Sequence, residues 1–172
     1  MARVVWAGFL YNIGVIPIKT ALKRIYKTLR GVEVNELLKI YRNMPLSIGA
    51  AELFSRLKQA GCRTALISSG LPRFVVEDLA SRLEAGLAVG CDVEVRDGRL
   101  TGSVGGEVIE PSGKATVLRE ILNEIGGDSA HCVTVVNDRN NVPMMSVSGR
   151  RIGFNPDALV NLKSDYVVNS HV

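Results

Sequence analysis

Short apolar runs alternate with amphipathic helical segments along most of this chain, and this alternation limits the fold more than any other feature. The apolar runs that are expected to form strands include residues 63–67, 132–136, 151–154 and 166–168. The segments with a helical period lie between them and include residues 49–60, 73–83 and 114–125. Because crossovers through helices place strands parallel, the sequence predicts an α/β fold, with a mostly parallel sheet and helices on both faces.

Turn chemistry adds one antiparallel pair to this arrangement. Asp97-Gly98 lies between the runs VEVR and RLTGSV, and Asp-Gly is typical of a two-residue hairpin turn. A hairpin is therefore expected within residues 93–108. A short helix is expected at residues 145–148, after a polar loop. In the helix predicted at residues 49–60, Leu53 and Leu57 are expected to face the core.

The first 45 residues differ from the rest. Residues 18–29 have apolar side chains at helical spacing with a basic opposite face, and residues 34–42 give a second helix. We expect these two helices to form a compact hairpin. With 172 residues, 47% of them apolar, the chain can form one main core. The predicted domains are residues 1–45, an apolar segment with a helical appendage, and residues 46–172, an α/β core.

Composition restricts the partners and the location. The 21 basic and 17 acidic residues leave a net charge of +4, which is mild, so no nucleic-acid partner is expected. Cys62, Cys91 and Cys132 are odd in number and mostly in apolar runs, which indicates small buried side chains in a reducing cytoplasm. Residues 4–18 carry no charge but are short for a membrane span, so no membrane association is expected. This apolar segment is a candidate contact for a homo-oligomer.

Polar residues follow two predicted strands and open one predicted helix. Ser68 and Ser69 follow the first strand, residues 137–141 follow a later one, and Lys114 begins a helix. In an open parallel α/β sheet the ligand lies beyond the carboxyl ends of the strands. A hydroxyl, backbone amides at a helix start and an ammonium group suit a phosphate. Taken singly, the serines are equally typical of a helix cap and the lysine of a solvated side chain.

Together and in this order, these segments resemble the haloacid dehalogenase superfamily, and within it the phosphoserine phosphatase-like group. The run VRDGRLTGSVGGEVIEPSGKATVL is similar to that group's hairpin and lysine segment almost position by position. ALISSG resembles the second motif, VVNDRNNVPM resembles the fourth, and FNPDALVNLKSDYVV resembles the segment that follows it. The resemblance implies a Rossmann-like fold, with the helices at residues 18–42 as a shortened helical cap.

The resemblance also implies roles for single residues. Ser68 would bind the transferring phosphoryl group through its hydroxyl, and Lys114 would steady the phosphoryl charge. The implied substrate-binding positions are Ser69, Gly70 and Asn140. The implied metal positions are Asn137, Asp138 and Asn141.

The chain departs from the family's pattern at the nucleophile and at the metal. In the family an aspartate of a DxDxT-type first motif attacks phosphorus, whereas no aspartate precedes Asp78 in this sequence. Asn137 and Asn141 stand where two carboxylates would help to hold Mg²⁺, and an amide supplies a dipole in place of a charge. We therefore expect weak metal binding at best and no cofactor.

Two hypotheses for function follow. The first is a phosphatase-like domain that is catalytically impaired and serves as an anion-binding or assembly module, with phosphate or a small phosphorylated molecule as ligand. The second is an active, Mg²⁺-dependent phosphomonoester hydrolase of the family whose first-motif segment is missing from this sequence. Two minor alternatives are a different anion-binding or metal-dependent activity through Asp138 and nucleic-acid binding through the basic helix.

The missing first motif raises a structural question as well. Its strand lies in the family's sheet between the strands that end at Ser68 and at Asn137, and omitting it would leave backbone groups unpaired. The run RVVWAGFL could fill the position, the two neighbouring strands could pair directly, or the N-terminus of a second chain could insert.

Overall fold

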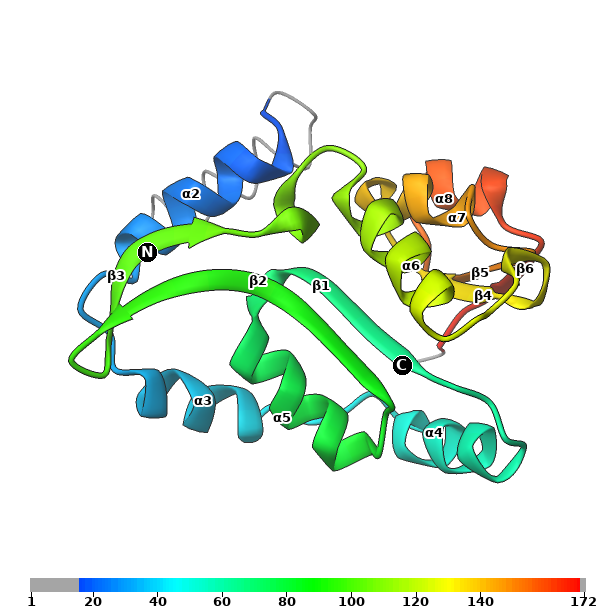
Figure 1. The fold of residues 1–172 in the computed structure, drawn as a ribbon, viewed down its shortest axis with the longest axis horizontal. Helices are drawn as coiled ribbons and strands as arrows, with labels where there is room; N and C mark the ends of the chain where they lie inside the picture. The colour runs from blue at the N-terminus through cyan, green and yellow to red at the C-terminus, as the bar shows by residue number, and fades with distance from the viewer. Residues whose placement is uncertain (1–15, 171–172) are drawn as a thin grey trace. The chain divides into compact units, whose positions relative to one another are not determined.

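The computed structural model describes residues 16–170, drawn as a coloured ribbon in Figure 1. These residues fall into two compact units, and each is described by itself. The N-terminal unit ends at Ile109 and the C-terminal unit begins at Glu110. The predicted boundary at residue 45 stays a prediction. Among residues 16–170, none of the helices has the length and apolar character that a membrane span requires.

The N-terminal unit contains a mixed three-stranded sheet. Its strands are β1 (Ala65–Pro72), β2 (Leu87–Arg96) and β3 (Arg99–Gly105). β2 lies in the middle, parallel to β1 and antiparallel to β3. Asp97 and Gly98 both have positive φ, 50° and 72°, as a type I′ turn requires. The predicted hairpin is therefore confirmed, although β2 begins earlier than the sequence pattern indicated, because its first half pairs with β1.

The two predicted cap helices form as α2 (Ile18–Thr28) and α3 (Val34–Arg42), but the expected hairpin between them is wrong. α2 packs on β3, whereas α3 contacts α5 (Arg73–Leu83). In Figure 1 the two cap helices lie on opposite sides of the β2–β3 hairpin. The reason is that α2 buries its apolar face, formed by Ala21, Leu22 and Tyr26, against the sheet.

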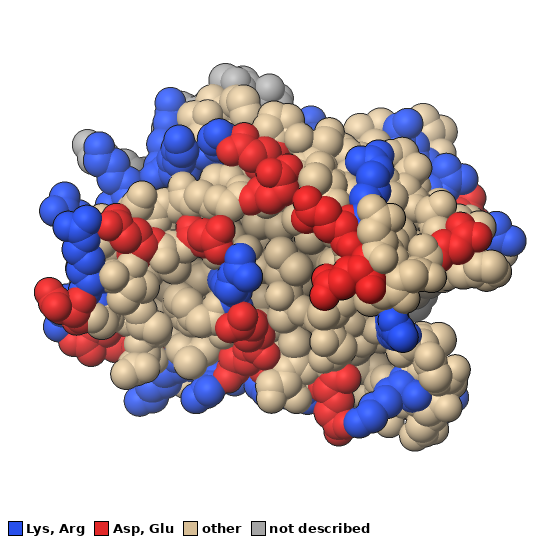
Figure 2. All heavy atoms as spheres, in the orientation of Figure 1, with Lys and Arg blue, Asp and Glu red and all other residues tan. Residues whose placement is uncertain are grey.

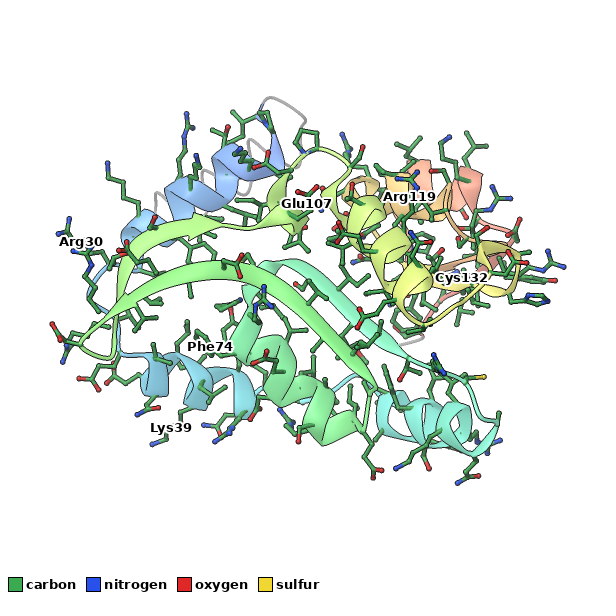
Figure 3. All side chains as sticks on the ribbon, in the orientation of Figure 1. Arg30, Lys39, Phe74, Glu107, Arg119 and Cys132 are labelled. Atoms are coloured by element: carbon green, nitrogen blue, oxygen red, sulfur yellow. The ribbon has the colours of Figure 1, made fainter. Side chains whose placement is uncertain are left out.

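The outer face of α2 is basic. Lys23, Arg24 and Lys27 are exposed, and Figure 2 shows Lys and Arg side chains gathered over this helix. Arg30, just after the helix, also points away from the sheet (Figure 3). The helix is thus amphipathic as predicted, and its charged side is turned to solvent.

The helix predicted at residues 49–60 is α4 (Ala50–Gln59), but its packing differs from the expectation. None of its residues is buried, and Leu53 is 49% exposed, so the prediction that Leu53 and Leu57 face a core is wrong. Gly61 follows the helix with φ of 74°, which confirms the predicted glycine at its end.

The C-terminal unit contains an all-parallel three-stranded sheet in the order β4-β5-β6. Its strands are β4 (Val133–Val136), β5 (Arg150–Phe154) and β6 (Tyr166–Val168), and its helices are α6 (Gly113–Glu124), α7 (Val142–Met145) and α8 (Ala158–Lys163). The strands agree with the predicted runs to within one residue. α7 begins before the predicted position because Pro143 favours a helix's first turn. α8 was not predicted.

Each unit has its own buried apolar residues. In the N-terminal unit they include Val75, Val76, Leu100, Val108 and Ile109; in the C-terminal unit they include Ala115, Val117, Val136, Met145 and Val160. The prediction of buried cysteines is confirmed for Cys91, which is 0% exposed, and wrong for Cys62, which is exposed.

The run RVVWAGFL, proposed to fill the position of the family's first-motif strand, lies outside the described residues. Within residues 16–170, β1 is paired with β2 alone and β4 with β5 alone. Both strands therefore have one edge without a ladder partner among the described strands.

Candidate functional site

The second-motif residues lie in a bulge of β1. The sequence pattern predicted that the strand would end at residue 67, but it continues to Pro72. Ile67 pairs with Val89 and Pro72 pairs with Cys91, so residues 68–71 of β1 lie opposite Gly90 alone. A bulge of this size turns backbone groups out of the ladder, and such bulges are typical of sites where a strand re-aims a side chain.

Gly90 permits the bulge to lie close to β2. A Cβ at this position would be 2.6 Å from the Arg73 nitrogen and 2.7 Å from the Leu71 carbonyl oxygen. Both are backbone atoms, which cannot move aside as a flexible side chain can. Glycine is therefore required here by the close approach of two backbones.

The two serines of the bulge differ in their surroundings. Ser68 is half-buried, and its Oγ accepts a hydrogen bond of 3.2 Å from the Leu71 N–H. Ser69 is 3% exposed, and its hydroxyl donates to the Val108 carbonyl over 2.6 Å. The Ser68 hydroxyl proton has no acceptor within the described part of the N-terminal unit, so Ser68 is the serine that can donate to a ligand.

Two side chains from outside the second motif also hold the bulge. Tyr26 Oη donates to the Gly70 carbonyl over 2.9 Å, and Cys91 Sγ lies 3.3 Å from the Leu71 carbonyl oxygen. Sequence reasoning missed both residues. Their periodicity and apolar surroundings indicated burial only, and no local pattern connects either one to the serines.

In the C-terminal unit, Lys114 lies in the first turn of α6 and turns towards the fourth-motif loop. Its Nζ donates a hydrogen bond of 2.6 Å to Asn141 Oδ1. Burial lowers the pKa of Lys114, and the negative charge of Asp138 opposes that effect. The alternative considered from sequence, a Lys114 side chain turned to solvent, is therefore wrong.

Asn141 is the centre of this loop and is only 6% exposed. Its Nδ2 donates to Asp138 Oδ1 over 3.2 Å and to Asn137 Oδ1 over 3.4 Å. Asp138 Oδ1 also accepts from the Asn140 N–H over 2.9 Å, as the cap of a short 3₁₀ turn. The three implied metal positions and Lys114 are thus joined into one hydrogen-bonded cluster.

Asp157, which the sequence reasoning did not single out, fixes the loop to α8. One carboxylate oxygen accepts from the Arg139 N–H over 2.8 Å and the other accepts from the Val160 N–H over 2.9 Å. The Asp157 N–H in turn donates to the Asn137 carbonyl over 2.8 Å. An aspartate before an apolar helical stretch is a typical N-cap, and that signal could have identified it.

The residues of this loop do not fit Mg²⁺. Mg²⁺ requires several hard oxygen ligands in octahedral geometry, most often including carboxylates. Here Asp138 supplies the only carboxylate of the three positions, and no cluster of three or more His, Cys, Asp or Glu that could hold a metal occurs in residues 16–170. Asn141 Oδ1 is already bonded to an ammonium group, which repels a second cation.

The structure thus brings Lys114 together with Asn137, Asp138 and Asn141 in one unit. Ser68, Ser69 and Gly70 lie together in the bulge of the other unit. Their joint action on one ligand stays a prediction, as does the substrate-binding role of Asn140.

Comparisons with known proteins agree on one family. The family model for haloacid dehalogenase-like hydrolases matches residues 1–146. Phosphoserine phosphatase of Haemophilus influenzae is 31% identical over 156 residues, covering 91% of this chain and 49% of the relative. That of Archaeoglobus fulgidus is 35% identical over 142 residues, 83% of this chain and 41% of the relative. The chain therefore spans about half the length of these curated relatives. The relative from Idiomarina loihiensis is 30% identical over 162 residues, 92% of this chain and 71% of its own length.

Solved structures support the same fold. A phospho-aspartyl intermediate analogue of phosphoserine phosphatase has a TM-score of 0.87 at 24% identity, covering 97% of this chain and 79% of its own. A HAD family hydrolase from Salmonella enterica serovar Typhi has a TM-score of 0.90 at 21% identity, covering 98% and 58%. The α/β, Rossmann-like fold is confirmed, and the chain belongs to the haloacid dehalogenase-like hydrolase family, with relatives of the phosphoserine phosphatase type.

Proposed function

We propose that this chain is a phosphate-binding domain of the phosphoserine phosphatase type that does not hydrolyse its ligand by the family mechanism. The observation that carries the proposal is the hydrogen bond from Lys114 to Asn141. This hydrogen bond places a positively charged side chain of the protein beside the loop that binds Mg²⁺ in the family. The partner of the Lys114 ammonium group is the amide oxygen of Asn141, at a position where the family's pattern has a carboxylate.

The charges of the cluster favour an anion as the ligand. Lys114 contributes a positive charge that burial makes costly, and an amide oxygen compensates it less than a carboxylate would. Asp138 offsets part of that charge, but its bonded oxygen is already used by two N–H donors. A phosphate oxygen beside Lys114 would complete the pairing. Within the N-terminal unit, the Ser68 hydroxyl is the donor that we propose for a phosphate oxygen.

The carboxylates that the reaction needs are absent from the relevant positions of this sequence. Asn137 and Asn141 are amides, and no aspartate occurs before Asp78. A serine or an amide cannot form the acyl phosphate on which the family's two-step route depends. The ligand class that we propose is therefore inorganic phosphate or a small phosphorylated molecule.

The second candidate is an active phosphomonoester hydrolase. It is favoured by the relatives, several of which are phosphoserine phosphatases. This candidate needs a nucleophilic aspartate from a segment outside the sequence given, and it needs a metal site in spite of Asn137 and Asn141.

Thermal unfolding in phosphate tests the proposal. At a concentration tenfold above Kd, phosphate should raise Tm by about 3–6 °C over chloride at matched ionic strength. Lys114→Ala should remove that increment, whereas Lys163→Ala, at an exposed position on α8, should retain it. Equal stabilisation by phosphate and chloride, or an unchanged increment in Lys114→Ala, would refute the proposal.

A further inference from the structure

Tyr26 connects the cap helix α2 to the second-motif bulge. Its side chain is 3% exposed, and its hydroxyl donates to the Gly70 carbonyl over 2.9 Å. Cys91 Sγ lies 3.5 Å from the same hydroxyl and 3.3 Å from the Leu71 carbonyl oxygen. Three elements, α2, β1 and β2, therefore meet at one small hydrogen-bonded cluster.

The bulge depends on donors of this kind. Residues 68–71 have only Gly90 opposite them, so the bulge interrupts the regular register of the β1–β2 ladder. Buried carbonyls need hydrogen-bond donors, and here Tyr26 Oη donates to the Gly70 carbonyl while Cys91 Sγ lies 3.3 Å from the Leu71 carbonyl oxygen. Tyr26 is thus part of what makes the shape of the bulge stable.

The position of Tyr26 is itself fixed by close packing of α2 on β3. Gly102 has φ of 88°, and a Cβ there would be 3.3 Å from the Tyr26 carbonyl oxygen and 3.2 Å from Lys27 Cα. The helix therefore lies against the strand at a site where only glycine fits comfortably. The main chain at Tyr26 cannot move away from β3 without breaking this contact.

The hydroxyl remains a donor at every working pH. Burial, with a smaller contribution from Cys91, raises the pKa of Tyr26 far above its ordinary value. Deprotonation, which would turn the donor into an acceptor facing a carbonyl, does not occur in the accessible range.

We propose that Tyr26 is a positioning residue for anion binding: by holding the Gly70 carbonyl it fixes the bulge that presents the Ser68 hydroxyl to a phosphate group. This inference rests on the proposed function, because it assumes that Ser68 contacts the phosphate. The cap helix α2 would thereby help to hold the second-motif bulge in the conformation that binds phosphate.

The test compares Tyr26→Phe with Tyr41→Phe. Tyr41 is a half-buried tyrosine on α3 near Cys91, and its hydroxyl has no hydrogen-bond partner among the described residues, so it is a matched control. Loss of one hydrogen bond should weaken phosphate binding about three- to tenfold in Tyr26→Phe. Tyr41→Phe should retain the parent Kd. Calorimetric titration with inorganic phosphate measures both.

Amide hydrogen exchange separates positioning from a merely structural effect. The Leu71 N–H donates to Ser68 Oγ, so its exchange reports whether the bulge is held. In Tyr26→Phe it should exchange about three- to tenfold faster, whereas the Val104 N–H of β3 should be unchanged. Uniform acceleration throughout the unit would overturn the proposal, since it would indicate general destabilisation.

The outcomes distinguish this inference from the proposed function. If the parent binds phosphate, Lys114→Ala does not, and Tyr26→Phe binds as the parent does, the positioning role is refuted while the proposed function stands. If the parent does not bind phosphate, the proposed function fails and so does the role of Tyr26 in binding. Should Tyr26→Phe not fold, Cys91→Ala removes the other donor to the bulge and must show the same local acceleration at Leu71; its absence would overturn the proposal.

Discussion

Asn141 does within this loop what a metal ion does in a carboxylate site, namely join several oxygen atoms that would otherwise repel one another. Its amide N–H group bridges the oxygens of Asn137 and Asp138, and its own oxygen accepts from Lys114. An aspartate could accept from Lys114 but could not donate to Asp138. The amide is therefore suited to a loop that closes without a divalent cation.

The double variant Asn137→Asp with Asn141→Asp tests that idea. It removes the bridging N–H groups and adds two charges beside Asp138, so saturable Mg²⁺ binding should appear in isothermal titration where the parent has none. The control variant, Asn123→Asp with Asn161→Asp, has the same net charge at exposed positions. Micromolar Mg²⁺ binding by the parent would contradict the prediction. Hydrolysis should not return, because the nucleophile is still missing.

Lys114 makes the free energy of unfolding depend on pH, and the direction of that dependence follows from its lowered pKa. Burial lowers its pKa in the folded chain below the ordinary 10.5, so between these two pKa values the unfolded chain binds more protons. Stability contributed by this group therefore rises as pH increases through that window. The difference in free energy of unfolding between the parent and Lys114→Met should increase with pH. The total increase should be roughly 1.4 kcal/mol for each unit by which folding lowers the pKa of Lys114. Urea titrations from pH 7 to 10.5 measure it, and a flat or falling difference would contradict the burial.

At the scale of elements, the junction of β1 and β2 decides whether the second motif has its shape. Gly90→Ala would put a Cβ 2.6 Å from the Arg73 nitrogen, so the backbones must separate. We expect a loss of about 3 kcal/mol or more in the free energy of unfolding, together with faster exchange at Leu71. Gly105→Ala is the control, because nothing lies within 4 Å of its Cβ and its φ is ordinary. Similar small effects of both substitutions on chemical denaturation would show that the strands are not held so close.

Local signals predicted the elements well and their packing poorly. The helices α3 and α5 begin and end where periodicity placed them, and the Asp97-Gly98 turn forms as its chemistry requires. Periodicity indicates which face of a helix is apolar but not what covers it, which is why Leu53 is exposed against expectation. Tyr26 could not be recognised either, since its acceptor, Gly70, is 44 residues away.

The candidate site could be predicted from the sequence where the type of a residue alone indicates a function. Lys114 and the amides of the fourth-motif loop were chosen from sequence, and they do lie together. Asp157 was not chosen, although it joins the loop to α8 by accepting from one backbone N–H of the loop and one of the helix. In the sequence, Asp157 is typical of an ordinary helix N-cap. Only the fold shows that the helix it caps lies next to the loop.

At the scale of the whole molecule, the two hypotheses for function differ in the carboxylates of the reaction, namely the nucleophile and the metal ligands. The three curated relatives named above are phosphoserine phosphatases, whereas this sequence has no aspartate before Asp78. The chain covers about half of the first two relatives, 49% and 41%. The decision therefore depends on the activity of the chain itself, with Mg²⁺ supplied.

Phosphate release from phosphoserine with Mg²⁺ present should be negligible for the purified chain. Loss of the covalent route removes the main source of rate enhancement, and neither Ser68 nor Lys114 can accept a phosphoryl group as an acyl phosphate. Lys114→Ala, prepared identically, identifies a contaminating phosphatase, because contamination gives equal rates in both preparations. Turnover on the order of 1 per second that disappears in Lys114→Ala would refute the proposal that the chain does not hydrolyse its ligand. It would also require a nucleophile other than an aspartate of the first motif, and Asp138, the single carboxylate in the loop, would be the residue to replace next.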